Sequence, residues 1–271
     1  YLKYIYISYN YIMASFAKDD NNNNETTPLI NPEGKIFTNE WSSDCNPVTG
    51  SILNKQNLRL ATFYYPVKGR KKVKGTILAI HGYGAHCHWE YMGYPYNTYK
   101  NSWVENFNNN GYNVLTYDHQ SHGLSQDLIP GVRCYIDRFD DLIDDALQIY
   151  YERKKNAKKK EKLYVLGISM GGNIAAHVAV RLGEELDGLV LGSPMVSVEK
   201  LKKKCINAIL LPISGCVSKC WPTLAVGAKA KNTMYPDMAK HREEDPLSYL
   251  GMIRARFATE SIATCDLVSI Q

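Results

Sequence analysis

One pentapeptide constrains the fold of this chain more than any other feature: Gly167–Gly171, with the sequence GISMG. The apolar run Leu163–Leu166 precedes it, and helical spacing follows over Met170–Leu182. A serine between a buried strand and a helix occupies a sharp turn, where side chains two positions before and after it would collide, so both end positions need glycine. The turn exposes the hydroxyl of Ser169, and the free N–H groups of the helix can stabilise negative charge beside it. Ser169 is therefore the candidate nucleophile.

Short apolar runs alternate with helical patterns along much of the remaining chain. Such alternation is typical of a parallel sheet that helices cover on both faces. We therefore expect an α/β fold with a mostly parallel sheet. The expected strands are Phe63–Val67, Thr76–Ile80, Tyr112–Tyr117, Leu163–Leu166 and Leu189–Leu191, and the expected helices are Trp103–Gly111, Phe139–Tyr150 and Met170–Leu182.

The alternation is absent from both ends of the chain. Residues 1–50 include an asparagine run and scattered prolines, which predict a flexible polar leader before a core over residues 51–195. Translation is expected to start at Met13, the alternative being a short signal-like segment upstream. Residues 196–250 are too long for an ordinary loop, so we expect an inserted cap or lid there. Residues 251–271 are typical of a helix that returns to the core, and the last strands of the sheet are expected to be missing.

Charge and cysteine content limit the partners of this chain. The net charge of +5 is modest, and the basic residues cluster at Lys68–Lys74, Arg153–Lys162 and Lys200–Lys204. Such runs are typical of solvated loops, although the last, beside an apolar stretch, equally fits a membrane surface. The seven cysteines have neither paired nor zinc-site spacing, which indicates reduced thiols and no metal. We expect no cofactor, no nucleic-acid partner, and a cytoplasmic or peripheral membrane location.

A second motif, His81–Gly84 (HGYG), ends one of the expected strands. In this architecture a loop after an earlier strand supplies a backbone N–H to the site, and Gly82 and Gly84 would let that backbone approach the substrate. His81 could be a base, but its place on a tight turn, before Ser169 in the chain, favours a structural histidine bonded to nearby backbone.

The third motif is Asp118–Ser125 (DHQSHGLS), directly after the strand Tyr112–Tyr117. It contains an acid and two histidines, as a catalytic triad does. Neighbouring residues cannot easily converge on one serine elsewhere in the sheet, so the motif favours a structural turn.

The ordered motifs HGYG, DHQSHGLS, GISMGG and GSPMV resemble the monoacylglycerol lipase and lysophospholipase branch of the α/β hydrolases, also described as the serine aminopeptidase-like group. The resemblance covers about residues 53–250, and Asp245–Leu247 (DPL) looks like the family's cap exit. It implies that Ser169 is the nucleophile and that the backbone N–H groups of Tyr83 and Met170 form the oxyanion hole.

The sequence departs from the family's pattern at two positions. Ile168 stands where many members have histidine, which should be tolerated because that side chain is outside the triad. Ser121 replaces a common glycine and is expected to stiffen its turn.

The family's triad needs an acid and then a histidine after the serine. Past the expected cap the chain offers Glu260 and Asp266 as acids, but no histidine. The histidines that follow the serine are His177, inside the next helix, and His241, in the cap. A cap-borne pair of Asp237 and His241 is conceivable, but we find no triad acid and no base in this chain.

The sequence therefore predicts a serine carboxylic-ester hydrolase that acts on lysophospholipid or monoacylglycerol through an acyl-enzyme on Ser169, in a C-terminally truncated chain. The alternative is a non-catalytic lipid-binding or interaction remnant of such a hydrolase. A peptidase is a third reading, although an apolar cap favours acyl chains. The apolar stretch Ile206–Val217 is too short to span a membrane, and it could face a lipid or simply pack on the core.

Overall fold

The computed structural model describes residues 4–7, 47–93, 98–158, 160–197, 214–226 and 235–270. Their main sheet has seven strands in the order β1-β7-β6-β4-β5-β3-β2. The strands β4, β5, β6 and β7 are parallel to one another, whereas β3 is antiparallel to both β2 and β5. The expected α/β fold with a mostly parallel sheet is confirmed. The strands are β1 (Tyr4–Ile7), β2 (Val48–Leu53), β3 (Arg59–Tyr65), β4 (Gly75–Ile80), β5 (Tyr112–Tyr117), β6 (Leu163–Ile168) and β7 (Gly188–Gly192).

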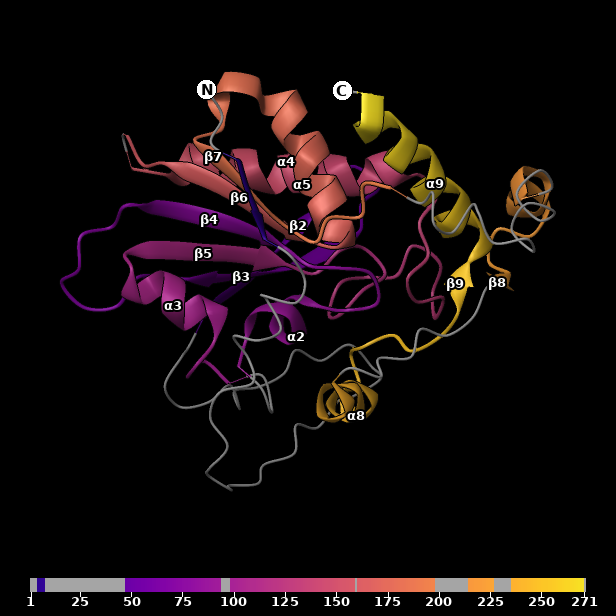
Figure 1. The fold of residues 1–271 in the computed structure, drawn as a ribbon, viewed down its shortest axis with the longest axis horizontal. Helices are drawn as coiled ribbons and strands as arrows, with labels where there is room; N and C mark the ends of the chain where they lie inside the picture. Colours follow the sequence, from indigo (N-terminus) through magenta and orange to yellow (C-terminus); the bar gives the residue numbers. More distant parts are fainter. Residues whose placement is uncertain are drawn as a thin grey trace.

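Helices cover both faces of this sheet (Figure 1). The helices α4, α5 and α9 lie on one face, and the shorter α2 and α3 lie on the other. Every residue of β4 is buried. Leu78 and Ile80 pack into the hydrophobic core beneath α4, α5 and α9, while Ile77 and Ala79 pack into the core beneath α2 and α3. The described helices are α2 (Cys87–Tyr91), α3 (Trp103–Asn109), α4 (Phe139–Asn156), α5 (Met170–Leu182), α8 (Pro236–Glu244) and α9 (Ala255–Ile270), with a 3-10 turn at Gly183–Glu185.

The register of the central strands brings the sequence motifs together. In the parallel pair β4–β6, Ile80 lies opposite Gly167. Both strands end within a residue of that pair, so the loop after β4 and the turn after β6 leave the same edge of the sheet. This edge is where ligands of open α/β sheets bind.

The N-terminal region contains two strands that the sequence did not predict. Within the expected leader, residues 4–7 form β1, which runs parallel to β7 with Tyr4 opposite Leu189. The strand β2 begins at Val48, within the expected leader, and all six of its residues pair with residues 59–64 of β3. The leader over residues 1–50 is thus not uniformly without secondary structure. The asparagine run and Met13 lie outside the described residues.

The expected cap is described in part. Residues 214–220 are helical, and β8 (Ala225–Val226) pairs antiparallel with β9 (Ile253–Arg254), directly before α9. The expected return helix is α9, which packs on α5 (Figure 1). The basic run Lys200–Lys204 and most of the apolar stretch after it lie outside the described residues. Among the helices that the structure describes, none is long and apolar enough to cross a membrane.

Candidate active site

Ser169 occupies a strained turn between β6 and α5. Its φ of 53° and ψ of −117° place a non-glycine residue in a sparsely populated region of backbone space. Backbone hydrogen bonds fix this geometry: the N–H of Ser169 donates to the carbonyl of Gly192 (3.0 Å), and its own carbonyl accepts from the N–H of Met195 (2.8 Å). Ser169 is exposed to solvent, whereas its neighbours Ile168 and Met170 are buried. The sequence therefore folds here into an exposed serine at a helix N-terminus.

The glycines around the serine are needed for steric reasons. A Cβ on Gly167 would overlap the carbonyl of Gly171, and a Cβ on Gly171 would overlap the carbonyl of Ile80. A Cβ on Gly172 would lie 2.7 Å from the Cβ of Pro194, which is closer than real contacts allow. The collision that the sequence predicts two residues before and after Ser169 is therefore present in the structure.

The loop after β4 lies directly against the serine. A Cβ on Gly82 would lie 3.3 Å from the Cβ of Ser169, so the HGYG backbone borders the nucleophile turn. The N–H of Gly82 donates to Oε2 of Glu90 (3.3 Å). Tyr83 follows in this loop, and Met170 is the first residue of α5, where an N–H has no acceptor within its own helix. These are the two residues whose N–H groups the family resemblance assigns to the oxyanion hole.

Gly84 lies against the chain that follows α8. Its φ is +69°, and a Cβ there would lie 2.9 Å from the carbonyl oxygen of Tyr249. The N–H of Tyr249 in turn donates to the carbonyl of Gly84 at 2.8 Å. Glycine is thus required at position 84 by a close backbone approach of the chain that follows α8. The expected approach of the Gly82 and Gly84 backbone to substrate stays a prediction.

His81 is a structural histidine, as its place on a tight turn predicts. Its side chain is fully buried, its Nδ1 lies 2.8 Å from the carbonyl of Gly82, and its Nε2 accepts from the N–H of His119 (3.1 Å). Burial, followed by the neighbouring rings of His119 and His122, lowers the pKa of His81 well below its usual value. Both ring nitrogens are thus occupied by backbone groups.

The DHQSHGLS motif is also structural. The carboxylate of Asp118 accepts from the N–H groups of Cys87 (2.9 Å) and Leu124 (2.8 Å), which ties the turn to the start of α2. Ser121 has a φ of 61°, a conformation that favours glycine, which the family commonly has there. The predicted structural turn is confirmed.

The remaining candidate acids and bases bond elsewhere. Nε2 of His177 lies 2.8 Å from Oγ1 of Thr264, at the contact of α5 with α9. The ring of His241 packs against Trp89 on α2, with 5.4 Å between the centroids. Glu260 accepts from the backbone N–H of Phe139 (3.0 Å) at the start of α4. Asp237 is exposed on α8, and the side chain of Asp266 is not described. None of these described contacts brings an acid or a base to Ser169.

Sequence reasoning missed one buried pair next to the site. Nε2 of His86 lies 2.7 Å from Oδ2 of Asp245, and only 1% and 8% of these residues is exposed. The two residues are 159 positions apart, so no local pattern reports their contact. The only sequence signals were the position of Asp245 in the DPL triplet and that of His86 just after HGYG.

A mostly parallel sheet with helices on both faces, and a strained serine between a strand and a helix, define an α/β hydrolase with a serine-hydrolase elbow. The chain belongs to the Hydrolase_4 family of serine hydrolases, described as serine aminopeptidase S33, whose model matches residues 71–269. The resemblance drawn from the ordered motifs is thereby confirmed at the level of the family.

Three proteins to which this chain is similar are named as a lysophospholipase or as lipases. It is 24% identical over 151 residues to a probable lysophospholipase L2 of Haemophilus influenzae, covering 55% of this chain. The match covers 44% of that relative, so this chain spans under half of its length. A monoglyceride lipase variant from Saccharomyces cerevisiae, solved with a substrate analog, superposes with a TM-score of 0.63 at 18% identity, over 81% of this chain and 68% of the other. A Paleococcus ferrophilus monoacylglycerol lipase gives 0.56 at 20%, over 78% and 71%. At these identities the two structures establish the fold.

Proposed function

We propose that this chain carries the nucleophile and oxyanion hole of a carboxylic-ester hydrolase that acts on lysophospholipid or monoacylglycerol. The observation that carries the proposal is the strained, exposed Ser169, at a φ of 53°, with the Gly82 backbone against it. Strain of this kind persists where the surrounding fold over-determines it, and it clusters at functional sites. The HGYG loop and the turn that carries Ser169 leave the same edge of the sheet, which is where ligands of open α/β sheets bind.

In the proposed reaction, Oγ of Ser169 attacks the ester carbonyl and a base takes its proton. The carbonyl oxygen becomes an oxyanion, and the N–H groups of Tyr83 and Met170 donate to it. The C–O bond to the alcohol then breaks, glycerol or the glycerophosphodiester part of the lysophospholipid leaves with a proton, and the acyl group remains on Ser169. Water cleaves this acyl-enzyme and releases the fatty acid.

None of the described contacts of the seven histidines brings a ring nitrogen to Ser169, where it could act as the base. Without its histidine, a serine hydrolase loses activity by about a millionfold, and the residual rate comes from the oxyanion hole and from binding. We therefore expect acylation of Ser169 in this chain to be slow. The rate of acylation, rather than the occurrence of the elbow, is the quantity to measure.

The proposed substrate class rests on relatives and on exposed apolar side chains. The relatives are named lysophospholipase, monoglyceride lipase and monoacylglycerol lipase. Near β8 and β9, large apolar side chains remain exposed, Trp221 by 64% of its surface and Leu224 by 49%. Their neighbours Leu250, Met252 and Ile253 are also exposed. Such a cluster could contact an acyl chain or the surface of a lipid aggregate, and we propose peripheral membrane contact there.

Labelling with a fluorophosphonate tests the nucleophile. The purified chain should be labelled slowly, Ser169→Ala should not be labelled, and Ser51→Ala, which removes an exposed serine on β2, should behave as the wild type. Fatty-acid release from monooleoylglycerol and from lysophosphatidylcholine, against a short peptide ester as comparison, then tests the substrate class. Equal rates on all three would contradict the lipid assignment.

The alternative function is a lipid-binding remnant without catalysis. The observation that favours it is the lack of a histidine contact to Ser169 among the described residues. It predicts that a folded wild-type chain binds monooleoylglycerol, measured by calorimetry, but is not labelled by the fluorophosphonate. Labelling that depends on Ser169 refutes it.

A further inference from the structure

The chain after α8 is attached to the HGYG loop by several independent contacts. We define the clamp segment as Arg242–Tyr249, which includes the end of α8 and the DPL triplet. In Figure 1, α8 lies beside α2, in agreement with the ring contact between His241 and Trp89. This segment therefore borders the proposed oxyanion loop.

The central contact is the buried pair of His86 and Asp245. The ring Nε2 of His86 donates to Oδ2 of Asp245 at 2.7 Å. The other carboxylate oxygen accepts from the N–H of Leu247 (2.9 Å), and Oδ2 also accepts from the hydroxyl of Ser248 (3.3 Å). Three donors thus orient one carboxylate, which fixes the ring of His86 at the end of the loop.

Two further contacts reach the loop at its centre. The N–H of Tyr249 donates to the carbonyl of Gly84 at 2.8 Å, and the lack of a Cβ at Gly84 permits this approach, since a Cβ there would lie 2.9 Å from the carbonyl oxygen of Tyr249. Nη2 of Arg242 donates to the carbonyl of Tyr83 at 3.4 Å. The carbonyls of the consecutive residues Tyr83 and Gly84 are therefore both held by the clamp segment, and Tyr83 also carries the proposed oxyanion N–H.

We propose that His86 and Asp245 are positioning residues for the oxyanion hole: through the clamp segment they hold the backbone N–H of Tyr83 at the nucleophile turn. This inference rests on the proposed function for its catalytic consequence, but the clamp itself is a property of the fold. An oxyanion donor is effective only when its position is fixed before the reaction, and a displacement of about 1 Å can cost about a hundredfold in rate.

The test compares Asp245→Asn with Glu243→Gln, a matched removal of one negative charge from an exposed position on the same helix. Hydrogen exchange is followed by mass spectrometry on peptides that cover residues 81–92. Asp245→Asn should raise exchange in this loop by at least tenfold and leave β6 and α4 unchanged, whereas Glu243→Gln should match the wild type. Unchanged exchange in the loop would overturn the clamp.

Fluorophosphonate kinetics test the catalytic consequence. Asp245→Asn should lower the limiting labelling rate about tenfold and leave the apparent affinity for the probe unchanged, because substrate contacts stay intact. A variant with a loosened loop and a wild-type labelling rate would overturn the positioning role. If the folded wild type is not labelled at all, the proposed function is refuted, while a local rise in loop exchange still supports the clamp.

A second pair of variants covers the case in which Asp245→Asn does not fold. His86→Gln keeps an N–H donor for the carboxylate, and His86→Ala removes it. The glutamine variant should retain most of the loop protection and labelling rate, and the alanine variant should lose both. Equal behaviour of the two variants would contradict the assignment, because a hydrogen bond to Asp245 could not then be the cause.

Discussion

Asp145, in the middle of α4, and Asp245, at the end of α8, are both removed from solvent, with 3% and 8% of their surfaces exposed. Burial raises the pKa of each carboxyl, but the outcomes diverge. The pKa of Asp145 rises to about 7, whereas hydrogen bonding and charge from His86 bring the pKa of Asp245 down to about 2. Two buried acids therefore differ in charge state at neutral pH.

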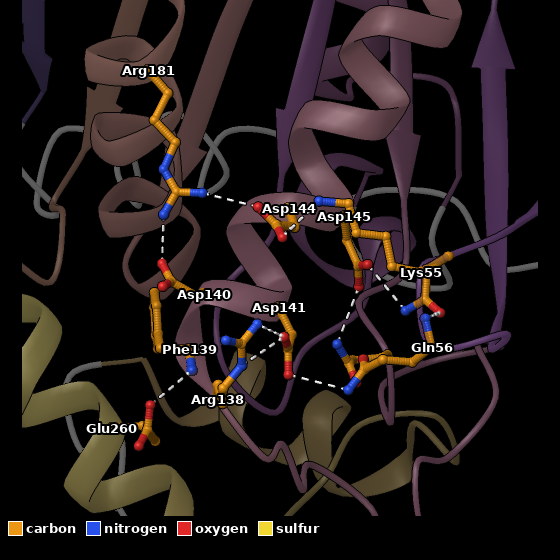
Figure 2. A network of polar contacts seen from close by, with 12 residues as sticks. Lys55, Gln56, Arg138, Phe139, Asp140, Asp141, Asp144, Asp145, Arg181 and Glu260 are labelled. Atoms are coloured by element: carbon orange, nitrogen blue, oxygen red, sulfur yellow. Dashed lines mark hydrogen bonds and ion pairs between the residues drawn. The ribbon is translucent and has the colours of Figure 1, made fainter.

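The surroundings of Asp145 explain its high pKa (Figure 2). Its oxygens accept from two neutral amides, Asn54 Nδ2 (3.0 Å) and Gln120 Nε2 (3.2 Å), which only partly offset desolvation. The nearby Asp141 and Asp144 raise its pKa further. The cations of this region bind the other aspartates of α4, with Lys55 on Asp144, Arg138 on Asp141, and Arg181 on Asp140 and Asp144.

The type of donor, rather than the depth of burial, separates the two acids. Asp245 receives an imidazole N–H and a backbone N–H, which favour the charged form. A carboxylate that holds a loop in place has to stay ionised in order to keep such bonds short. An acid inside the scaffold, such as Asp145, can bind a proton near neutral pH without loss of the fold. Substitutions at or near Asp145 and Asp245 should therefore change stability and its pH dependence in different ways.

The largest expected effect is on the side of Asp245. Asp245→Ala leaves His86 and the N–H of Leu247 buried without their acceptor, which should lower the free energy of unfolding by roughly 3–5 kcal/mol. Urea denaturation at pH 7 measures this, and Glu243→Ala, exposed on the same helix, should change it by less than about 0.5 kcal/mol. A loss for Asp245→Ala as small as that of the control would remove the distinction between the two acids.

The contribution of Asp245 to the stability of the wild type should depend on pH in one direction. The folded pKa of Asp245, about 2, lies below the ordinary value of 3.8, so its contribution to stability is fully present above pH about 4. That contribution is lost as the pH falls from about 4 to about 2. In urea titrations across this range, Asp245→Ala should lose less stability than the wild type, because the group that titrates is gone.

Asp145 should show the opposite pH dependence. Its folded pKa of about 7 exceeds the ordinary value of 3.8, so the folded state binds the proton more tightly than the unfolded state. The contribution of Asp145 to stability is then highest below pH about 4, falls as the pH rises to about 7, and stays constant above that. At about 1.4 kcal/mol for each pKa unit, this group costs roughly 4–5 kcal/mol at pH 8.

Asp145→Asn should remove that cost. At pH 8 the variant should be more stable than the wild type by roughly 2 kcal/mol, because Oε1 of Gln120, buried without a partner, can turn to accept from the new amide. Between pH 4 and 7 its urea midpoint should stay flat where that of the wild type declines. Parallel curves for the two proteins would show that Asp145 does not titrate near pH 7.

The strands and helices around the sheet edge that carries Ser169 could be predicted from the sequence, because the periodicity of local burial determines them. The helix predicted over Met170–Leu182 has the observed bounds, and the glycine requirement around Ser169 follows from local sterics. Contacts between distant segments were not predictable: Asn54 and Asp145 are 91 positions apart, and His86 and Asp245 are 159. The strand β1 was also missed, since four residues carry too little pattern to specify a partner strand.

Glu260 is a third acid that accepts a hydrogen bond from the backbone, and its loss should change the free energy of unfolding less than the loss of Asp245. Its Oε2 accepts from a single backbone donor, the N–H of Phe139, at the positive end of α4 (Figure 2). Glu260→Gln keeps an acceptor but removes the charge, so it should cost about 0.5–1 kcal/mol of unfolding free energy, and less in 1 M salt. Glu184→Gln, exposed on the 3-10 turn, is the control. A loss as large as that of Asp245→Ala would place Glu260 with the loop-holding acids.

The smallest change in stability is expected for a substitution at Ser121, the neighbour of Gln120, whose amide donates to Asp145. Ser121 has a φ of 61°, and its hydroxyl accepts from the N–H of Leu128 (3.0 Å). Ser121→Gly relieves backbone strain worth about 1 kcal/mol and removes a hydrogen bond worth about as much, so stability should change by less than about 0.5 kcal/mol. The titration of Asp145, followed by the urea midpoint from pH 4 to 8, should also be unchanged, because the turn keeps its backbone bonds. If that titration moves, the amide of Gln120 depends on the strained turn, and the high pKa of Asp145 would then reflect loop geometry as well as the neutral donors.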